Sequence, residues 1–110
     1  MSEPADAGRL ELVGPLTVRN IEEVRARLLE AAGQHRDVII DCTLVTAIDL
    51  SFIQLVLAAR RSAIAAGRTV SLSHPADGIL YDRLLQAGIL GAGAAEPAGD
   101  RALWLNEEAA

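Results

Sequence analysis

A chain of 110 residues with 51% hydrophobic content is long enough for one folded domain and too apolar to be a disordered segment. Its net charge of −5 and its single Phe, Tyr and Trp argue against a nucleic-acid-binding protein, which needs a basic surface and often aromatic stacking platforms. The chain contains arginine but no lysine, so chemistry that depends on a lysine is excluded.

The N-terminal part of the chain predicts a strand after a short flexible segment. We expect residues 1–8 to be a flexible N-terminus and residues 9–110 to form the domain. Apolar and polar residues alternate from Arg9 to Val13, which is typical of a half-buried strand. Gly14-Pro15 should end this strand, and Leu16-Thr17 would then pair briefly as a second short strand.

An amphipathic helix is predicted next, because apolar residues recur at spacings of three and four. They are Val18, Ile21, Val24, Leu28 and Ala31. We expect Thr17 or Asn20 to cap this helix and Gly33 to end it. The apolar run between Asp37 and Asp41 is then typical of a strand buried on both faces.

A second helix is predicted from about Ser51 to Ala66, with Gly67 at its C-terminal end. Its first half is apolar almost all round, so it should start against the core or against a partner. A third strand follows at 69–73, and a third helix, opened by Pro75, ends at Gly88.

A last strand is predicted at 102–105. Helices that alternate regularly with strands indicate an α/β fold with an at least partly parallel sheet.

The residues that most often carry catalysis or bind metals form no convincing site. His35, His74 and Cys42 lack the spacing of metal ligands, and a single cysteine leaves no intrachain disulfide. Asp41 and Asp49 flank a loop, and they either form an acid–base pair or satisfy backbone donors at a strand end and a helix start. A receiver-type phosphoryl acceptor at Asp41 is rejected, because the first strand ends without acids and lysine is absent. We therefore expect no enzymatic activity, no metal and no cofactor.

Ser51 is the residue on which the functional interpretation depends. With Gln54 it fits a capping box, and Leu50 and Leu55 occupy the positions of a hydrophobic staple. A phosphate on the same hydroxyl would be tolerated, because the free N–H groups and dipole of a helix N-terminus favour negative charge. It would add about −1.5 to −2 charges to an apolar rim and repel a partner that packs there. The two roles, cap and switchable phosphate acceptor, are compatible.

Three segments follow one another in an informative order. They are Leu12–Thr17, then Val38–Ser51 with its strand, loop and Asp-Leu-Ser sequence, then 66–72 together with 84–89. Over some 80 residues in this order they resemble the STAS domain of bacterial anti-sigma factor antagonists. The resemblance implies one STAS-like domain, with a mixed sheet of four to five strands and three to four helices packed mainly on one face.

The same resemblance implies a partner switch. It places Ser51 on the family's phosphorylatable serine and Asp49 on the acid two residues before it. The unphosphorylated protein would bind a kinase-type anti-sigma or signalling regulator, which would phosphorylate Ser51 with ATP and separate; a phosphatase would reset the system. Leu50 and Phe52 depart from the family's Asp-Ser-Ser-Gly motif, and Phe52 is either part of the core or an aromatic anchor for the partner.

We expect the partner to contact a short segment around the serine, namely Asp49, Leu50, Ser51, Phe52, Gln54 and Leu55. The alternative function is a non-phosphorylated STAS docking subunit of a membrane lipid-transport ABC complex. In both cases we expect a cytoplasmic protein, a monomer or weak dimer, with no nucleic-acid partner and no membrane-inserted segment.

Overall fold

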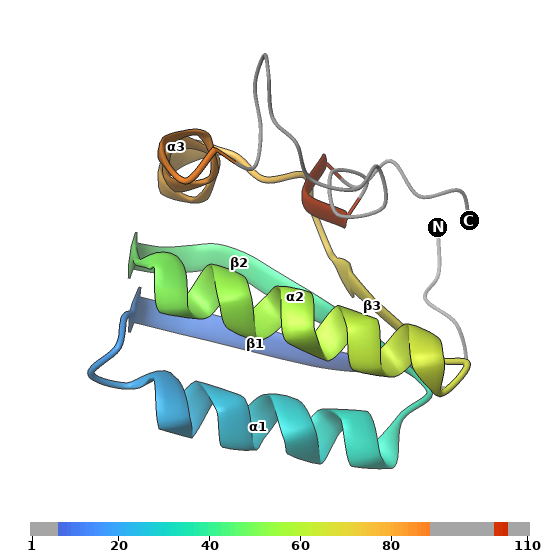
Figure 1. Ribbon diagram of the computed structural model, residues 1–110. Coiled ribbons are helices and arrows are strands. Elements are labelled where there is room, and N and C mark those ends of the chain that lie inside the picture. Colours follow the sequence, from blue (N-terminus) through green and yellow to red (C-terminus); the bar gives the residue numbers. More distant parts are fainter. Residues whose placement is uncertain (1–6, 89–102, 106–110) are drawn as a thin grey trace.

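The computed structural model of the protein describes residues 7–88 and 103–105. Strands and helices alternate along the first of these ranges, which confirms the predicted α/β class (Figure 1). In chain order the elements are β1 (Ala7–Leu16), α1 (Ile21–Gln34), β2 (Asp37–Ile48), α2 (Leu50–Ala65), β3 (Thr69–Leu72) and α3 (Gly78–Gln86).

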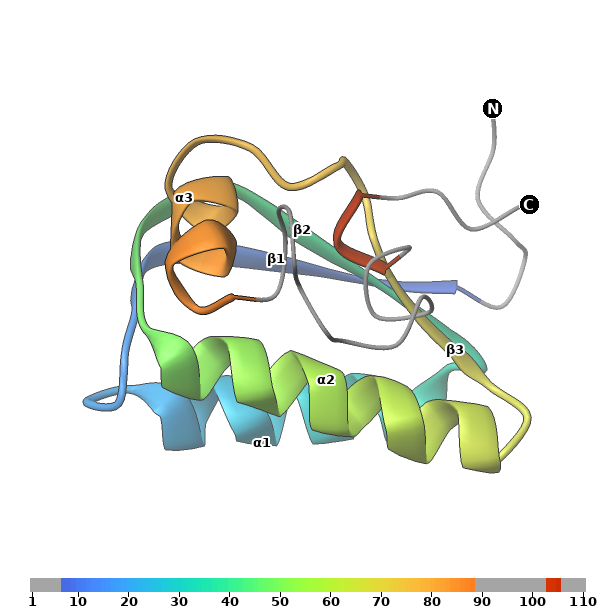
Figure 2. The ribbon, with the colours of Figure 1, turned by 45° about the horizontal axis from the view of Figure 1, so that its top comes forward.

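Within the described residues the sheet has three strands in the order β1-β2-β3, and both neighbouring pairs are parallel. Parallel strands that follow one another in this way are joined by right-handed crossovers, which place both connecting helices on one face. Helices α1 and α2 accordingly lie side by side on one face, while α3 and the short turn 103–105 lie across the sheet from them (Figure 2).

Within the described residues the sheet is smaller than predicted, and its strands are all parallel. The described part of the chain contains three parallel strands in place of a mixed sheet of four to five. Residues 103–105, which the alternating pattern assigned to a last strand, form a helical turn; Ala102 lies outside the described residues. The buried Leu103 and Trp104 therefore contribute to the core from a turn, and the backbone N–H of Ala76 donates to the Trp104 carbonyl at 2.7 Å.

One core joins the sheet to the helices on both sides. Alternate residues of β1 and β2 point into it, as the period of two predicts. The buried residues include Leu10, Leu12 and Leu16 of β1, Val38 and Ile40 of β2, Val24 and Leu28 of α1, Phe52, Ile53 and Val56 of α2, and Leu80 and Leu84 of α3.

Both long strands run further than the sequence predicted. β1 continues through Gly14-Pro15 to Leu16, because Gly14 takes a left-handed backbone conformation (φ 80°) and the register shifts twice, next to Val13 and Pro15. β2 continues to Ile48, whereas the prediction ended it at Asp41. In the extension Thr43, Leu44 and Thr46 are exposed and only Ile48 is buried, yet its backbone pairs with β1 as far as Ile48.

The helix ends also differ from the predicted ones in instructive ways. α1 begins at Ile21, so Val18 lies in the preceding loop and is 69% exposed. Asn20 occupies the N-cap position, but its side chain binds the Thr17 N–H and the Pro15 carbonyl and does not cap the helix.

At the C-terminal ends of the helices one prediction holds and one fails. Gly67 does follow the end of α2 with φ 73°, and the N–H groups of Gly67 and Arg68 bind the Ile64 and Ala63 carbonyls as in a Schellman motif. Gly33, by contrast, lies inside α1, which continues to Gln34.

Candidate functional site

The junction between β2 and α2 lies at the carboxyl edge of the sheet. Ile48 pairs with Leu16 at the ends of β2 and β1, and the Asp49 N–H donates to the Leu16 carbonyl at 3.2 Å. The loop that follows β1 is therefore the neighbour of the first turn of α2. In parallel sheets this edge is where binding sites usually form.

Asp49 is the N-cap of α2 and joins the two segments. Its Oδ1 accepts the Ser51 N–H at 3.0 Å and also the Ser51 hydroxyl. Its Oδ2 accepts the N–H of Val18, a residue of the loop between β1 and α1, at 2.8 Å. One carboxylate thus holds the helix start, the serine hydroxyl and the neighbouring loop together.

The prediction that Ser51 caps α2 is wrong, because the helix begins one residue earlier and Asp49 is the cap. Ser51 is the second residue of the helix, so Gln54 cannot complete a capping box with it. With Asp49 as the cap, the two positions of the hydrophobic staple are Ile48 and Ile53, in place of Leu50 and Leu55. Both isoleucines are buried in the core, at 4% and 0% exposure.

Hydrogen bonds lower the pKa of Asp49 from its ordinary value. The largest cause is the bond from the Ser51 hydroxyl; the backbone N–H groups of Val18, Ser51 and Phe52 act in the same direction, and partial burial opposes them. The carboxylate at the start of α2 is therefore ionised at neutral pH.

The six predicted contact residues divide by exposure. Leu50 is 48% exposed and Gln54 is exposed, whereas Asp49, Ser51 and Leu55 are partly buried. Phe52 is fully buried at 0% exposure, so of the two interpretations offered for it the core position holds and it presents no surface to a partner.

Val18, which the apolar spacing assigned to the first helix, lies in the loop next to the first turn of α2. The Val18 backbone binds Asp49, and the Val18 side chain is exposed. Leu50 and Gln54 are one helical turn apart and therefore share a face of α2. We call Val18, Leu50, Ser51 and Gln54 the α2 rim.

Arg83 of α3 also supports the junction, although no sequence pattern predicted this role. Its Nε donates to the Ile48 carbonyl at 2.9 Å, and its Nη1 donates to Gln86 Oε1 at 3.0 Å. Arg83 therefore fixes the backbone directly before Asp49. No local pattern predicts a contact between residues so far apart in the sequence, and an arginine in a helix is most simply a solvated charge.

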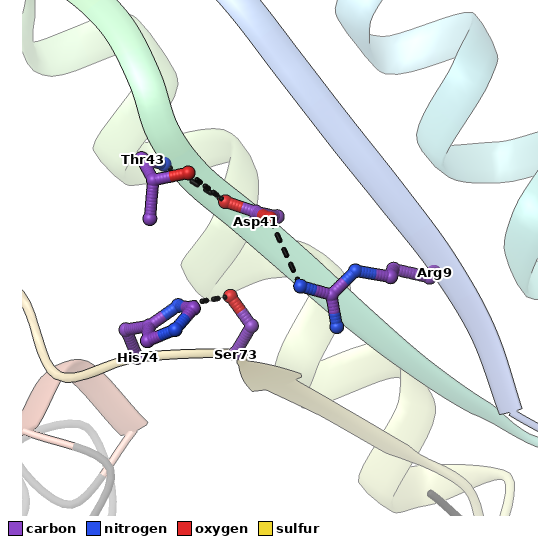
Figure 3. A network of polar contacts seen from close by, with 5 residues as sticks. All are labelled: Arg9, Asp41, Thr43, Ser73 and His74. Carbon is purple, nitrogen blue, oxygen red and sulfur yellow. Dashed lines mark hydrogen bonds and ion pairs between the residues drawn. The ribbon is translucent and has the colours of Figure 1, made fainter.

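A second carboxylate network lies on the sheet itself (Figure 3). Asp41 is 5% exposed; its Oδ1 accepts the Thr43 N–H at 2.9 Å and the Thr43 hydroxyl at 2.6 Å, and its Oδ2 pairs with Arg9 Nη2 at 2.9 Å. The pKa of Asp41 is lowered, first by the Thr43 hydroxyl, then by the Thr43 N–H and also by Arg9, against the effect of burial. Asp41 and Asp49 each satisfy local donors, which agrees with the second of the two roles considered for them.

The other potentially reactive side chains do not add chemistry to either network. Burial raises the pKa of the Cys42 thiol to about 12, so the thiolate that would act as a nucleophile is not formed at neutral pH. His74 is exposed and shares a hydrogen bond of 2.8 Å with the Ser73 hydroxyl (Figure 3). Among the residues that the structure describes, no three His, Cys, Asp or Glu side chains gather into a group that could hold a metal ion.

Helices of the described ranges are all too short or too polar to cross a membrane.

Comparison with known proteins identifies the family. A family model described as "Mlab, STAS domain" matches residues 1–88, while none of the curated proteins matches the chain. Similar solved structures include a sulfate transporter family protein from Wolinella succinogenes, at 20% identity and a TM-score of 0.61, covering 80% of this chain and 71% of that one. The anti-sigma factor antagonist SpoIIAA in its unphosphorylated form, at 20% identity and a TM-score of 0.59, covers 93% of this chain and 90% of its own.

A third similar structure, Mglu, is a much longer protein. It is 24% identical with a TM-score of 0.56, and the match covers 67% of this chain but only 19% of Mglu. At these identities the solved structures show a shared fold and leave function open. The family model extends over residues 1–88 of the 110 and so confirms the resemblance seen in the sequence. The chain belongs to the STAS domain family, in the group described as Mlab.

Proposed function

We propose that this STAS domain is a non-catalytic, partner-switching regulator. It would bind a kinase-type anti-sigma or signalling protein in the cytoplasm through the α2 rim, and phosphorylation of Ser51 would release that partner. The observation that carries the proposal is the hydrogen bond from the Ser51 hydroxyl to Asp49, because the same carboxylate holds the Val18 loop. A change at this one hydroxyl therefore acts on both sides of the rim.

Phosphorylation would alter the rim in two ways. It replaces the hydroxyl hydrogen that Asp49 accepts by a group of about −1.5 to −2 charges, so that an attraction becomes a repulsion. The carboxylate would then be displaced from the Val18 N–H or the phosphate would turn outward between Val18 and Leu50. Either movement places charge on a surface that an apolar partner needs to desolvate.

The position of Ser51 at the start of α2 explains why the fold would survive this change. Ser51 is the second residue of a helix of 16 residues, and the dipole of a helix stabilises a negative group at its N-terminal end. The modification would therefore weaken binding much more than it weakens folding.

The transfer itself requires an ATP-holding kinase partner. The Ser51 oxygen would attack the γ-phosphorus, the bond to ADP would break, and the hydroxyl proton would pass to a base. Asp49 is a weak base because its pKa is lowered, so its role would be to orient the hydroxyl. The proton acceptor would then be a carboxylate of the kinase.

The test is affinity capture with purified wild type, Ser51→Ala and Ser51→Asp, followed by identification of the bound proteins. Ser51→Ala should retain a kinase-type regulator and Ser51→Asp should lose it, with both variants folded by circular dichroism. Ser62→Asp is the matched control, because it puts the same charge at an exposed position further along α2 and should still bind. Retention of the kinase by Ser51→Asp would disprove the switch.

The second candidate function is a constant docking subunit of a membrane transporter, such as a lipid-transport ABC complex. It is favoured by the similarity to a sulfate transporter family protein and by the SulP transporter STAS domain from Vibrio cholerae, which has a TM-score of 0.53. In that role the α2 rim would bind without a phosphate cycle. Recovery of a transporter ATPase, equally by wild type and both Ser51 variants, would establish this function in place of the switch.

A further inference from the structure

A groove of about 280 Å³ lies between α1 and α2, along the part of α2 that follows the rim. On α2 it extends from Leu55 to Ala66, and its floor includes Val38 and Val70 of the sheet. The α2 wall is made mostly of small side chains, namely Ala58, Ala59, Ser62, Ala63 and Ala66. Larger residues would have filled this space at the density normal for a protein interior.

The charge of the groove is opposite to that of the chain. Arg25, Arg36 and Arg68 line it, and none of its lining residues is an acid, although the chain carries a net charge of −5. Arg68 Nη1 donates to the Ala32 carbonyl in the last turn of α1, which holds its guanidinium across the end of the groove. A guanidinium has five N–H donors, so this bond leaves others for an anion.

Two of the arginines lie at the same end. The Thr69 N–H donates to the Arg36 carbonyl at 3.2 Å, so the segments that carry Arg36 and Arg68 are paired where β2 and β3 begin. From there the apolar wall extends toward Leu55, a length of about 16 Å at the helical rise of 1.5 Å per residue. The groove thus has a cationic end and an apolar length.

We propose that this groove binds an anionic amphiphile with a single chain, such as a fatty carboxylate or an alkyl phosphate. Its head group would lie against Arg68 and Arg36, since the planar guanidinium can donate two N–H bonds to two oxygens of one carboxylate or phosphate. Its chain would lie along Ala63 and Ala59, where burial of apolar surface stabilises it. An acidic peptide helix is a poorer match, because a helix is about 10 Å across and would cover the groove without filling it.

The proposal is independent of the switch. Ser51 lies outside the residues that line the groove, and the ligand needs no phosphate cycle. A negative result in the capture experiment would not contradict ligand binding in the groove. A negative result in ligand binding would not contradict the phosphorylation switch.

The direct test is a titration of the whole ¹⁵N-labelled protein with dodecanoate below its micellar concentration. Saturable amide shifts should concentrate at groove residues such as Ala59, Ala63 and Arg68. Dodecyltrimethylammonium, which has the same chain and the opposite charge, should bind at least about tenfold more weakly. Equal binding of the two probes, absence of saturable shifts, or shifts located elsewhere would each overturn the proposal.

Two variants locate the head group and the chain. Arg68→Gln keeps a donor for the Ala32 carbonyl but loses the charge, and it should weaken dodecanoate about tenfold; Arg19→Gln, which makes the same charge change in an exposed loop, should not. Ala63→Leu should abolish binding by filling the groove, while its thermal midpoint stays unchanged or rises. Unaltered affinity of Ala63→Leu would show that the chain does not lie there and would refute the site.

Discussion

Asp41 and Asp49 make the same local contact in two different surroundings. In each case Oδ1 accepts both the backbone N–H and the hydroxyl of the residue two positions later, Thr43 or Ser51. The second oxygen distinguishes them: in Asp41 it pairs with the Arg9 guanidinium, and in Asp49 it accepts a backbone N–H. One carboxylate is neutralised by a fixed charge and the other by helix and backbone dipoles.

This difference bears on what the two hydroxyls can do. Thr43 lies in a strand and its carboxylate partner is 5% exposed, so the pair is part of the sheet. Ser51 lies at a helix N-terminus, where the helix dipole favours a negative group. An acid with a hydroxyl residue two positions later is therefore expected to be structural on β2 and, under the proposed function, open to regulation on α2.

The largest expected effect is the loss of the buried pair. Asp41→Ala removes the acceptor of the Thr43 N–H, the Thr43 hydroxyl and Arg9, and should lower the free energy of unfolding by about 2–3 kcal/mol. This loss is smaller than that expected for a fully buried ion pair, because the Arg9 side chain is 44% exposed and water can solvate it when Asp41 is removed. Urea unfolding measures the change, with the exposed Glu11→Ala on β1 as a control expected within about 0.5 kcal/mol of wild type. Equal losses of unfolding free energy for the two substitutions would mean that the buried contacts of Asp41 do not stabilise the protein.

Loss of the helix cap should cost less. Asp49→Ala leaves the Ser51 and Val18 N–H groups without their acceptor and should lower the free energy of unfolding by about 1–2 kcal/mol, the usual range for an N-cap. Hydrogen exchange at Val18 should accelerate, since this amide depends on the cap. Asp49→Asn keeps one acceptor oxygen for the Ser51 N–H but turns an NH2 donor toward the Val18 N–H, so it should restore only part of the stability. A cost for Asp49→Ala above that of Asp41→Ala would reverse the ranking of the two networks.

The pH dependence of stability separates the two carboxylates from ordinary acids. Both have a pKa lowered in the folded state, so each contributes stability above the unfolded pKa of about 3.9, and this contribution is lost as the pH falls through the folded pKa. Wild type should therefore lose stability between about pH 5 and pH 2. Asp41→Asn should lose less over the same range, so the two curves approach each other in acid. Parallel curves would show that the pKa of Asp41 is unchanged by folding.

Local patterns predicted the order of the elements well, and tertiary contacts decided where they end. Periods of two and of 3.6 located the three strands and three helices between Ala7 and Gln86. The same patterns ended β2 at Asp41, because pairing with β1 determines its extension and no local preference encodes that pairing. The turn at 103–105 looked like a strand because its apolar residues face the core from a single turn.

The contacts around Ser51 were predicted only in part. The Asp-x-Ser spacing directed attention to Ser51 and Asp49, which the structure joins by hydrogen bonds, but the cap was assigned to the wrong member of the pair. Val18 and Arg83 reach this site from other elements, and a sequence alone does not reveal such long-range contacts. Phe52 could not be assigned from its position near the helix start, because burial of a first-turn residue depends on how the helix lies against the sheet.

The smallest expected effect is also the most specific to the Ser51 hydroxyl. Ser51→Ala removes the largest single cause of the lowered pKa of Asp49, so this pKa should rise toward the ordinary value, while stability falls by only about 1 kcal/mol because the Ser51 N–H bond remains. Thr43→Ala should raise the pKa of Asp41 less completely, since Arg9 still stabilises the carboxylate. Carboxyl ¹³C titrations by NMR measure both values. A larger rise in the pKa of Asp41 than in that of Asp49 would mean that Arg9 does little to stabilise the Asp41 carboxylate. The proposed difference between a carboxylate held by an arginine and one held by backbone dipoles would then be wrong.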